Sequence, residues 1–189
     1  NEAFFGRFDT PLEMAEHELA ATREMRALDV NAPEPLETFE HEGNAVLVLE
    51  YLPAFETLDD LDRPAAERVA PELFAALERM HRASLAHGDL RSENVLVTDN
   101  SLYFIDATNV HEGAIDQARA YDVACALAAL EPLVGPAAAV ETAAEHHPTD
   151  VLVAAEGYLD FVNLRPDHTF ETLPLRDEIQ KTVESGANS

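Results

Sequence analysis

The segment YDVACALAAL (121–130) constrains the fold of this chain more than any other. After Asp122 every residue in it is apolar, so a helix formed here has no face suited to water. The segment is far shorter than the roughly 20 residues that a membrane-spanning helix requires. It must therefore lie inside a protein core, and the helical pattern that begins at Ala118 predicts a lobe of several helices around it.

The N-terminal part of the chain predicts a smaller lobe that contains strands. Residues 3–8 (AFFGRF) are typical of a short aromatic strand, and Thr10–Leu28 of a helix with a capping box at its start. Residues 36–40 and 45–51 flank the turn sequence HEGN and predict a hairpin. The second of these strands reads VLVL at its centre, which is typical of a strand covered on both faces.

The rest of the chain predicts helices, interrupted by one short hairpin. A connector (52–64) leads into a helix over about Arg63–Arg82, which Pro71 either kinks or divides. The runs VLV and LYFI flank the turn sequence TDNS and predict this second, smaller hairpin. Beyond Ala118 the pattern is helical with a break at EPLVGP, and the segment from Leu164 is polar and is assigned to no element.

The charge of the chain restricts its partners and its environment. It carries 37 Asp and Glu against 12 Lys and Arg, a formal net charge of −25, and its single lysine is Lys181. Such a surface repels nucleic acid and anionic membranes, so we expect neither as a partner. Acidic residues spread along a chain that almost lacks lysine indicate adaptation to concentrated salt, which screens charges over a few ångströms. We therefore expect a haloarchaeal source.

The cysteine and histidine content points to a reducing compartment and to no evident metal centre. The single cysteine, Cys125, excludes a disulfide framework and is read as a small core residue. The first residues, NEAFFGRF, have neither the basic start nor the long apolar run of a signal peptide. We expect a cytoplasmic protein. His146 and His147 are interpreted as an exposed pair, because adjacent residues of a helix point in different directions.

A dense group of polar residues lies directly before the smaller hairpin, in HGDLRSENVLV (87–97). Asp89 and Asn94 are followed, one hairpin later, by Asp106, and such a hairpin can return the chain to the same edge of a cleft. Phosphoryl transfer needs a carboxylate that orients the attacking hydroxyl and takes its proton. It also needs one or two oxygen ligands that hold Mg²⁺ against the nucleotide phosphates. These three side chains are groups of the required types.

This segment resembles the catalytic loop and metal-binding segment of the protein-kinase-like superfamily, which read H-R-D-L-x-x-x-N and, after a hairpin, D-F-G. The HGD form resembles the RIO-like and small-molecule-kinase branches, the latter including aminoglycoside phosphotransferases. The resemblance implies that Asp89 is the catalytic base and that Asn94 and Asp106 are ligands of Mg²⁺. It also implies that Arg91 contacts the transferred phosphate. We interpret His87 as structural, with its ring bridging backbone groups near the loop.

The resemblance extends over most of the chain. Glu18 matches the glutamate of the superfamily's first helix, which helps to position the nucleotide. In LVLEYL, Leu49 matches the gatekeeper, and the resemblance implies that backbone groups of Glu50 and Leu52 bind the adenine of ATP. YDVACALAAL resembles the buried central helix of the larger lobe, whose first aspartate, here Asp122, braces the catalytic loop.

Several departures from the pattern leave two functions open. No glycine-rich loop precedes the first helix, and no lysine is present to pair with Glu18; Gly6 or Arg7 stands near the expected place. The D-F-G place reads Asp106-Ala107-Thr108. An active kinase with an unusual phosphate clamp is one reading. The alternative is a pseudokinase, a nucleotide-binding, scaffolding or regulatory module without efficient transfer.

We therefore expect an α+β, two-lobed protein-kinase-like fold with a truncated small N-terminal β lobe and a mainly helical C-terminal lobe. Residues 1–52 would supply the strand, the helix, the two-strand hairpin and the hinge. Residues 53–189 would supply the catalytic loop and the metal-binding hairpin. The expected activity is ATP- and Mg²⁺-dependent phosphotransfer, by a RIO-like serine/threonine protein kinase or a small-molecule kinase. The expected partners are ATP and a protein or small-molecule hydroxyl acceptor.

Overall fold

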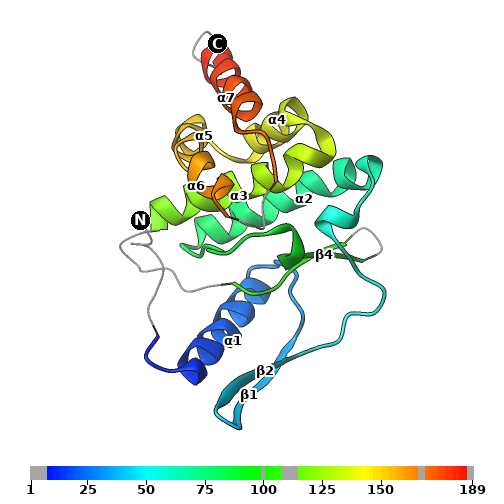
Figure 1. Ribbon diagram of the computed structural model, residues 1–189, viewed down its shortest axis with the longest axis vertical. Helices are drawn as coiled ribbons and strands as arrows, with labels where there is room; N and C mark the ends of the chain where they lie inside the picture. The colour runs from blue at the N-terminus through cyan, green and yellow to red at the C-terminus, as the bar shows by residue number, and fades with distance from the viewer. Residues whose placement is uncertain (1–7, 99–100, 108–114, 166–168, 187–189) are drawn as a thin grey trace.

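The computed structural model describes residues 8–98, 101–107, 115–165 and 169–186. It has the α+β architecture that the sequence predicts. A small lobe of one helix and one hairpin lies below a larger helical lobe in Figure 1. Among the described residues, no helix combines the length and the apolar character needed to cross a membrane. The strand expected over residues 3–8 lies outside the described residues except for its last position.

Helix α1 (Pro11–Ala27) starts where the sequence predicts, but its capping differs in one detail. Thr10 Oγ1 accepts a hydrogen bond from the N–H of Glu13 at 3.1 Å, which satisfies one of the free donors of the first turn. The carboxylate of Glu13 accepts from the N–H of Asp9 at 2.9 Å. The expected capping box, in which it would accept from Thr10, is therefore shifted by one residue.

Strands β1 (Pro35–His41) and β2 (Asn44–Leu49) form the predicted antiparallel hairpin. Both turn residues have positive φ, 51° at Glu42 and 80° at Gly43, as the tight turn of a two-residue hairpin requires. The interpretation of β2 as covered on both faces is wrong, because Ala45–Leu49 are all half-buried. Within the described residues this sheet has two strands, and α1 packs against them.

The segment expected to be a plain connector contains two short elements. Strand β3 (Glu56–Thr57) is followed by the 3₁₀ turn η1 (Leu58–Asp60). β3 pairs with β4 (Val95–Thr98), which pairs with β5 (Ser101–Phe104), and both pairings are antiparallel. The second predicted hairpin is thus confirmed, but it belongs to a three-stranded sheet that ties the linker after β2 to the polar loop before β4.

The helical lobe is built around α3 (Ile115–Val134), whose residues 121–130 are buried at every position, as predicted. The helix continues through the expected break at EPLVGP as far as Val134 and ends at Gly135, where φ is +88°. Figure 1 shows α3 at the centre of the lobe, and four helices that pack against it are α2 (Arg63–Arg82), α4 (Pro136–His146), α5 (Thr149–Glu156) and α6 (Leu159–Asn163).

Two further helices settle points that the sequence left open. α2 is one continuous helix that includes Pro71, with Asp62 as its cap. The polar segment after Leu164 contains α7 (Thr172–Gly186), which buries Leu175 and Ile179. α7 packs against α4 and α5, so the C-terminal segment completes the helical lobe.

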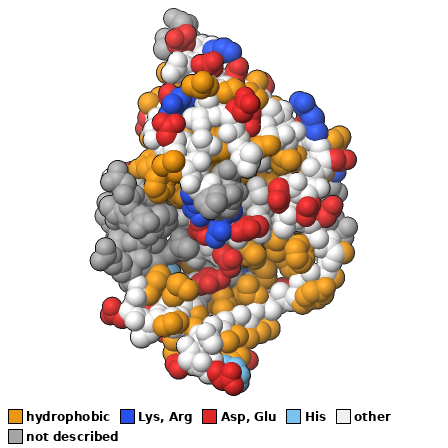
Figure 2. Space-filling view, viewed as in Figure 1, with side chains coloured by type: hydrophobic (Ala, Val, Ile, Leu, Met, Phe, Trp, Pro, Cys, Tyr) orange, Lys and Arg blue, Asp and Glu red, His pale blue; other side chains and the backbone are white. Residues whose placement is uncertain are grey.

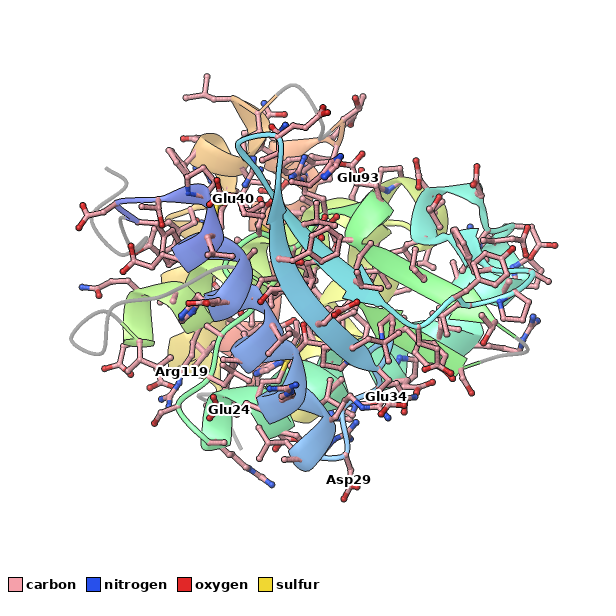
Figure 3. All side chains as sticks on the ribbon, turned by 90° about the horizontal axis from the view of Figure 1, so that it is seen from below. Glu24, Asp29, Glu34, Glu40, Glu93 and Arg119 are labelled. Atoms are coloured by element: carbon pink, nitrogen blue, oxygen red, sulfur yellow. The ribbon has the colours of Figure 1, made fainter. Side chains whose placement is uncertain are left out.

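Acidic side chains are spread over the surface of the part of the chain that the structure describes. Figure 2 shows them on both lobes of the displayed face. Glu24, Asp29, Glu34 and Glu40, labelled in Figure 3, come from α1, the loop after it and the hairpin, and all four are exposed. The negative charge of the small lobe is therefore mainly solvated.

Candidate functional site

One buried carboxylate of α3 fixes the backbone of the polar loop of residues 87–94. Asp122 is fully buried, and its Oδ2 accepts the N–H of His87 at 2.7 Å while its Oδ1 accepts the N–H of Gly88 at 2.8 Å. His81 Nε2 lies 3.1 Å from the same Oδ2. Gly88 has φ of +81°, a conformation in which a side chain is strained, which explains why glycine precedes the aspartate.

The ring of His87 connects this loop to the strand end that carries Asp106. His87 is fully buried; its Nε2 lies 2.9 Å from the carbonyl oxygen of Ile105, and its Nδ1 accepts the N–H of Asp89 at 3.4 Å. Burial lowers the pKa of His87, and the nearby carboxylates, Asp122 first, offset only part of that effect. A neutral ring with its proton on Nε2 satisfies both contacts. His87 is therefore placed to fix two backbone segments relative to each other.

Asp89 carries an arginine on each of its carboxylate oxygens. Arg91 donates to Oδ2 through Nη2 at 2.6 Å and Nε at 3.1 Å, and Arg165 donates to Oδ1 through Nη2 at 2.6 Å. Burial acts to raise the pKa of Asp89, but the hydrogen bonds and charges of Arg165 and Arg91 outweigh it and hold the pKa below its ordinary value. The carboxylate is thus ionised at neutral pH.

Asn94 is buried beside Asp89 and has three contacts that fix its position. Its Nδ2 donates to the carbonyl of Asp89 at 2.8 Å, and its N–H donates to the carbonyl of Arg91 at 3.0 Å. Its own carbonyl accepts the N–H of Ile105 at 3.1 Å. Because Nδ2 is engaged with the loop, Oδ1 is the side-chain atom that Asn94 can offer to a cation.

A pocket of about 280 Å³ brings together acidic groups from three parts of the chain. Glu18 comes from α1, Asp89 from the polar loop and Asp106 from the end of β5. Among the residues that the structure describes, the pocket is lined by Phe8, Met14, His17, Glu18, Asp89, Asp106 and Ala107. Asp106 has φ of +59°, a left-handed conformation that aspartate tolerates better than most residues. Asp106 is exposed, so its carboxylate is open to solvent.

Glu18 faces a carboxylate where the superfamily pattern would provide a cation. Burial, the charge of Asp106 and a hydrogen bond with Asp106 together raise the pKa of Glu18 from 4.5 to about 7. The lysine of the chain is remote, because Lys181 lies in α7 and is paired with Glu178 at 2.6 Å. Gly6 and Arg7, near the place expected for a substitute, lie outside the described residues.

This pair of carboxyl groups predicts a pH-dependent difference in stability. The pKa of Glu18 is higher in the folded state, so the proton stabilises the fold below about pH 4.5 and that contribution is lost as the pH rises through about 7. The free energy of unfolding of the wild type minus that of Glu18→Gln should therefore decrease as the pH rises from 4.5 to about 7. The comparison is made in buffer with EDTA. Urea unfolding measures it, with Glu16→Gln, an exposed position of α1, as the control. A difference that is flat with pH would contradict the pairing.

The residues expected to bind adenine lie outside this pocket. Leu49 ends β2 and is half-buried, as is Leu52. The N–H of Glu50 donates to the carbonyl of Glu34 at 2.8 Å, which ties the linker to the start of β1. None of the three is among the described residues that line the pocket. Their role toward a nucleotide stays a prediction.

Two residues of the site were not expected from the sequence. Arg165 follows α6, and besides Asp89 its Nη1 contacts the hydroxyl of Tyr121 at 2.5 Å. Arg165 is 76 positions from Asp89 and reaches the polar loop through a tertiary contact, and Tyr121, on α3, contacts Arg165. The one feature of the sequence that could have pointed to Arg165 is the scarcity of cationic residues in this chain, 12 Lys and Arg against 37 Asp and Glu.

The other residues singled out from the sequence lie away from this site. His147 is buried against Phe74 and His81, so the interpretation of an exposed histidine pair is wrong; His146 lies 3.6 Å from Glu78. Cys125 is fully buried in α3, as predicted, and burial raises the pKa of its thiol. Among the residues that the structure describes, no group of three or more His, Cys, Asp or Glu side chains is arranged to hold a metal.

Comparisons with known proteins show which families and folds the chain is similar to. A model of the RIO domain matches residues 9–123. The KEOPS complex subunit Bud32 of Pyrococcus abyssi is 30% identical over 87 residues, which cover 44% of this chain and 39% of Bud32. The mouse hormonally up-regulated neu tumor-associated kinase is 34% identical over 83 residues, 40% of this chain and 12% of that kinase. The chain thus spans well under half the length of these curated relatives.

Solved structures with a similar fold include two pseudokinases. The PAN3 pseudokinase of Neurospora crassa has a TM-score of 0.50 at 18% identity, over 97% of this chain and 52% of that one. The PAN3 pseudokinase of Drosophila melanogaster has a TM-score of 0.51 at 14% identity, over 98% of this chain and 59% of that one. At these identities the likeness concerns the fold alone.

Proposed function

Because this chain belongs to the RIO domain family, we propose that it is an ATP- and Mg²⁺-dependent phosphotransferase acting on a hydroxyl group. The acceptor belongs to a protein or to a small molecule; nucleic acid and anionic membranes are disfavoured by the net charge of −25. Residues 1–52 and 53–189 serve as its two lobes. A cytoplasmic location is part of the proposal, supported by the single cysteine, Cys125.

The observation that carries the proposal is the setting of Asp89. It is an ionised carboxylate on a loop whose N–H groups are fixed by the buried Asp122, and it opens into the pocket that also contains Asp106. Such a carboxylate orients an acceptor hydroxyl and takes its proton as the oxygen bonds to phosphorus. A low pKa suits this role, because in a loose transition state the proton leaves late.

Asn94 and Asp106 fit the Mg²⁺ ion that this chemistry uses. Mg²⁺ prefers oxygen ligands and is held by one or two protein groups together with substrate phosphates, which agrees with the absence of a larger ligand cluster among the described residues. Glu18 and Asp106 also crowd two carboxyl groups together, and a cation at Asp106 relieves that repulsion. When bound, Mg²⁺ neutralises charge on the transferred phosphoryl oxygens.

The remaining roles in the proposal are those that the resemblance to the superfamily implies. Arg91, next to Asp89, contacts the transferred phosphate, and His87 and Asp122 keep the loop in place. Leu49 acts as the gatekeeper, and the backbone of Glu50 and Leu52 binds adenine. Glu18 belongs to the nucleotide side of the pocket.

A pseudokinase is the alternative, and the surroundings of Glu18 favour it. Within the described part of the chain, Glu18 interacts with the carboxyl of Asp106, whereas the superfamily pattern places a lysine opposite this glutamate. In this reading the chain binds nucleotide, or serves as a scaffold, without efficient transfer.

Transfer of label from γ-³²P-ATP separates the two functions. We expect the wild type with Mg²⁺ to move label to water, to itself or to a mixture of serine peptides and small alcohols. EDTA should abolish the transfer. Retained Mg-ATP binding without any transfer would favour the pseudokinase.

A further inference from the structure

A second cavity, of about 430 Å³, lies on the helical lobe where the end of α2, the start of α3 and the junction of α4 with α5 meet. Among the residues that the structure describes, the polar side chains that line it are Glu78, His81, Arg82, Arg119, His146 and His147. We propose that this cavity binds a small hydroxylated anion, either a hydroxycarboxylate or the phosphate ester of a polyol. Arg119 holds the anionic group, and His147 accepts a hydrogen bond from the hydroxyl.

The charge of this cavity favours an anion. Two of the 12 cationic residues of the chain line it beside one carboxylate, whereas the described lining of the pocket at Asp89 contains three acidic residues and neither Lys nor Arg. Arg82 is paired with Glu78 at 2.6 Å, and the two charges compensate each other. Arg119 therefore supplies the positive charge of the cavity in a chain that otherwise repels anions.

Arg119, labelled in Figure 3, is weakly engaged by the protein. Its Nη1 lies 3.3 Å from Oδ1 of Asp116, which is 90% exposed, and its Nη2 lies 3.5 Å from Oγ of Ser84. Its Nε is buried and has no hydrogen-bond partner within the described part of the chain. Charge-assisted hydrogen bonds of this kind are about 2.7–2.9 Å long. The edge formed by Nε and Nη2, whose fork matches a carboxylate or a phosphate, is thus available to a ligand.

His147 supplies a buried acceptor. It is 6% exposed, and its ring packs against the rings of Phe74 and His81. Its Nε2 has no partner among the described residues, so its hydrogen bond to the backbone of Phe74 belongs to Nδ1. Burial and the neighbouring His81 and His146 lower the pKa of His147 to about 4, which keeps the ring neutral at pH 7. With the proton on Nδ1, Nε2 offers a lone pair.

These two nitrogens together define the ligand. The described residues contain three buried side-chain nitrogens without a hydrogen-bond partner, and two of them belong to residues that line this cavity. Such groups are rare in folded proteins and call for an occupant. A simple anion satisfies Arg119 alone and a neutral polyol satisfies His147 alone, so the occupant carries both groups. A metal ion is disfavoured, because no three His, Cys, Asp or Glu side chains of the described residues are arranged to hold one.

Two matched pairs of probes test the inference by calorimetry, without nucleotide and at one fixed KCl concentration. L-Malate and succinate carry the same two carboxylates, but malate also has a hydroxyl. Glycerol 3-phosphate and inorganic phosphate differ by the polyol. In at least one pair, the hydroxylated member should bind the wild type about tenfold more tightly than its partner. The pair that shows this preference identifies the anion as a carboxylate or a phosphate ester.

Variants of Arg119 test the anionic contact. Arg119→Gln should weaken binding of the hydroxylated anion about tenfold, and Arg119→Lys should weaken it less, because the charge remains while the fork is lost. Arg176→Gln is the matched control, since Arg176 is in α7, is 28% exposed against 26% for Arg119, and is paired with Asp160. It should bind the probes as the wild type does. If Arg119→Gln does not fold, Arg119→Lys decides.

His147→Phe tests the contact with the hydroxyl. The change keeps a ring beside Phe74 but removes Nε2, so the preference for the hydroxylated member should fall to within about twofold. The ring nitrogens of the wild type give a second measurement, which decides if this variant does not fold. In long-range ¹H–¹⁵N spectra, the signal of Nε2 of His147 should shift with the hydroxylated anion and stay unchanged with its partner.

The contrary results are distinct. No binding of any probe at about 10 mM, or no preference within either pair, overturns the inference. Binding that is as tight in Arg119→Gln as in the wild type places the anion elsewhere and also overturns it. A preference that survives His147→Phe, or an Nε2 signal that does not respond, overturns it as well. This cavity shares no described lining residue with the pocket at Asp89, so each of these results leaves the proposed phosphotransfer standing.

Discussion

Replacing Asp89 with Asn should lower the rate of phosphate transfer from ATP by about 10²- to 10⁴-fold while Mg-ATP still stabilises the protein. Asparagine has nearly the same shape but cannot accept the hydroxyl proton. Its amide group also presents hydrogens where Arg91 or Arg165 now donates, so the acceptor is oriented poorly. Transfer of γ-³²P and the thermal shift with Mg-ATP measure the two properties separately.

The control for this change is Asp160→Asn. Asp160 is 70% exposed and is paired with Arg176 at 2.8 Å. The substitution Asp160→Asn therefore removes a carboxylate of the same type at a position away from the pocket. Its transfer rate should equal that of the wild type. Transfer by Asp89→Asn at more than about a tenth of the wild-type rate would contradict general-base catalysis by Asp89.

Replacing Asp122 with Ala should reduce the free energy of unfolding by about 3–5 kcal/mol. The change removes one buried carboxylate that accepts the N–H groups of His87 and Gly88 and contacts His81. Each of these buried donors would then lack its partner. Urea unfolding monitored by circular dichroism gives the value, and the polar loop should lose its order first.

Two further variants calibrate that measurement. Asp122→Asn keeps one acceptor oxygen and should lose less than Asp122→Ala. Asp160→Ala breaks an exposed pair and should change stability by no more than about 0.5 kcal/mol. If Asp122→Ala were no less stable than Asp160→Ala, the polar loop would not depend on α3 for its position.

The elements that the sequence predicts well are those whose signal is local. Thr10 and Asp62 mark the starts of α1 and α2, the turn at Gly43 defines the hairpin, and the apolar run after Asp122 identifies the core helix. β3 could not be predicted, because a two-residue strand has no periodicity and forms by pairing with β4. The burial of β2 was misjudged because its composition does not say how many layers cover it.

The residues of the candidate site also divide into those with a local signal in the sequence and those without one. Asp89, Asn94 and Asp106 follow from one motif with short spacing, and the structure brings all three to the same region: Asn94 contacts the Asp89 backbone, and Asp106 shares the pocket with Asp89. Arg165 and the contact of Glu18 with Asp106 depend on how α6 and α1 pack, which no local pattern encodes. The sequence therefore predicts which polar residues come together, and the fold adds neighbours that shift their pKa values.

The most direct test of the account is thermal unfolding in molar KCl, with and without Mg-ATP, for the wild type and Asp106→Asn. At a Mg-ATP concentration about 100-fold above the dissociation constant, binding to the folded state adds about 2.7 kcal/mol of stability. For a chain of this size that raises the midpoint by about 5–10 °C. We predict this rise in the unfolding midpoint for the wild type. EDTA should abolish the rise, and Asp106→Asn should lose most of it. An absent rise at millimolar Mg-ATP, or an equal rise in Asp106→Asn, would contradict a metal–nucleotide site at Asp106.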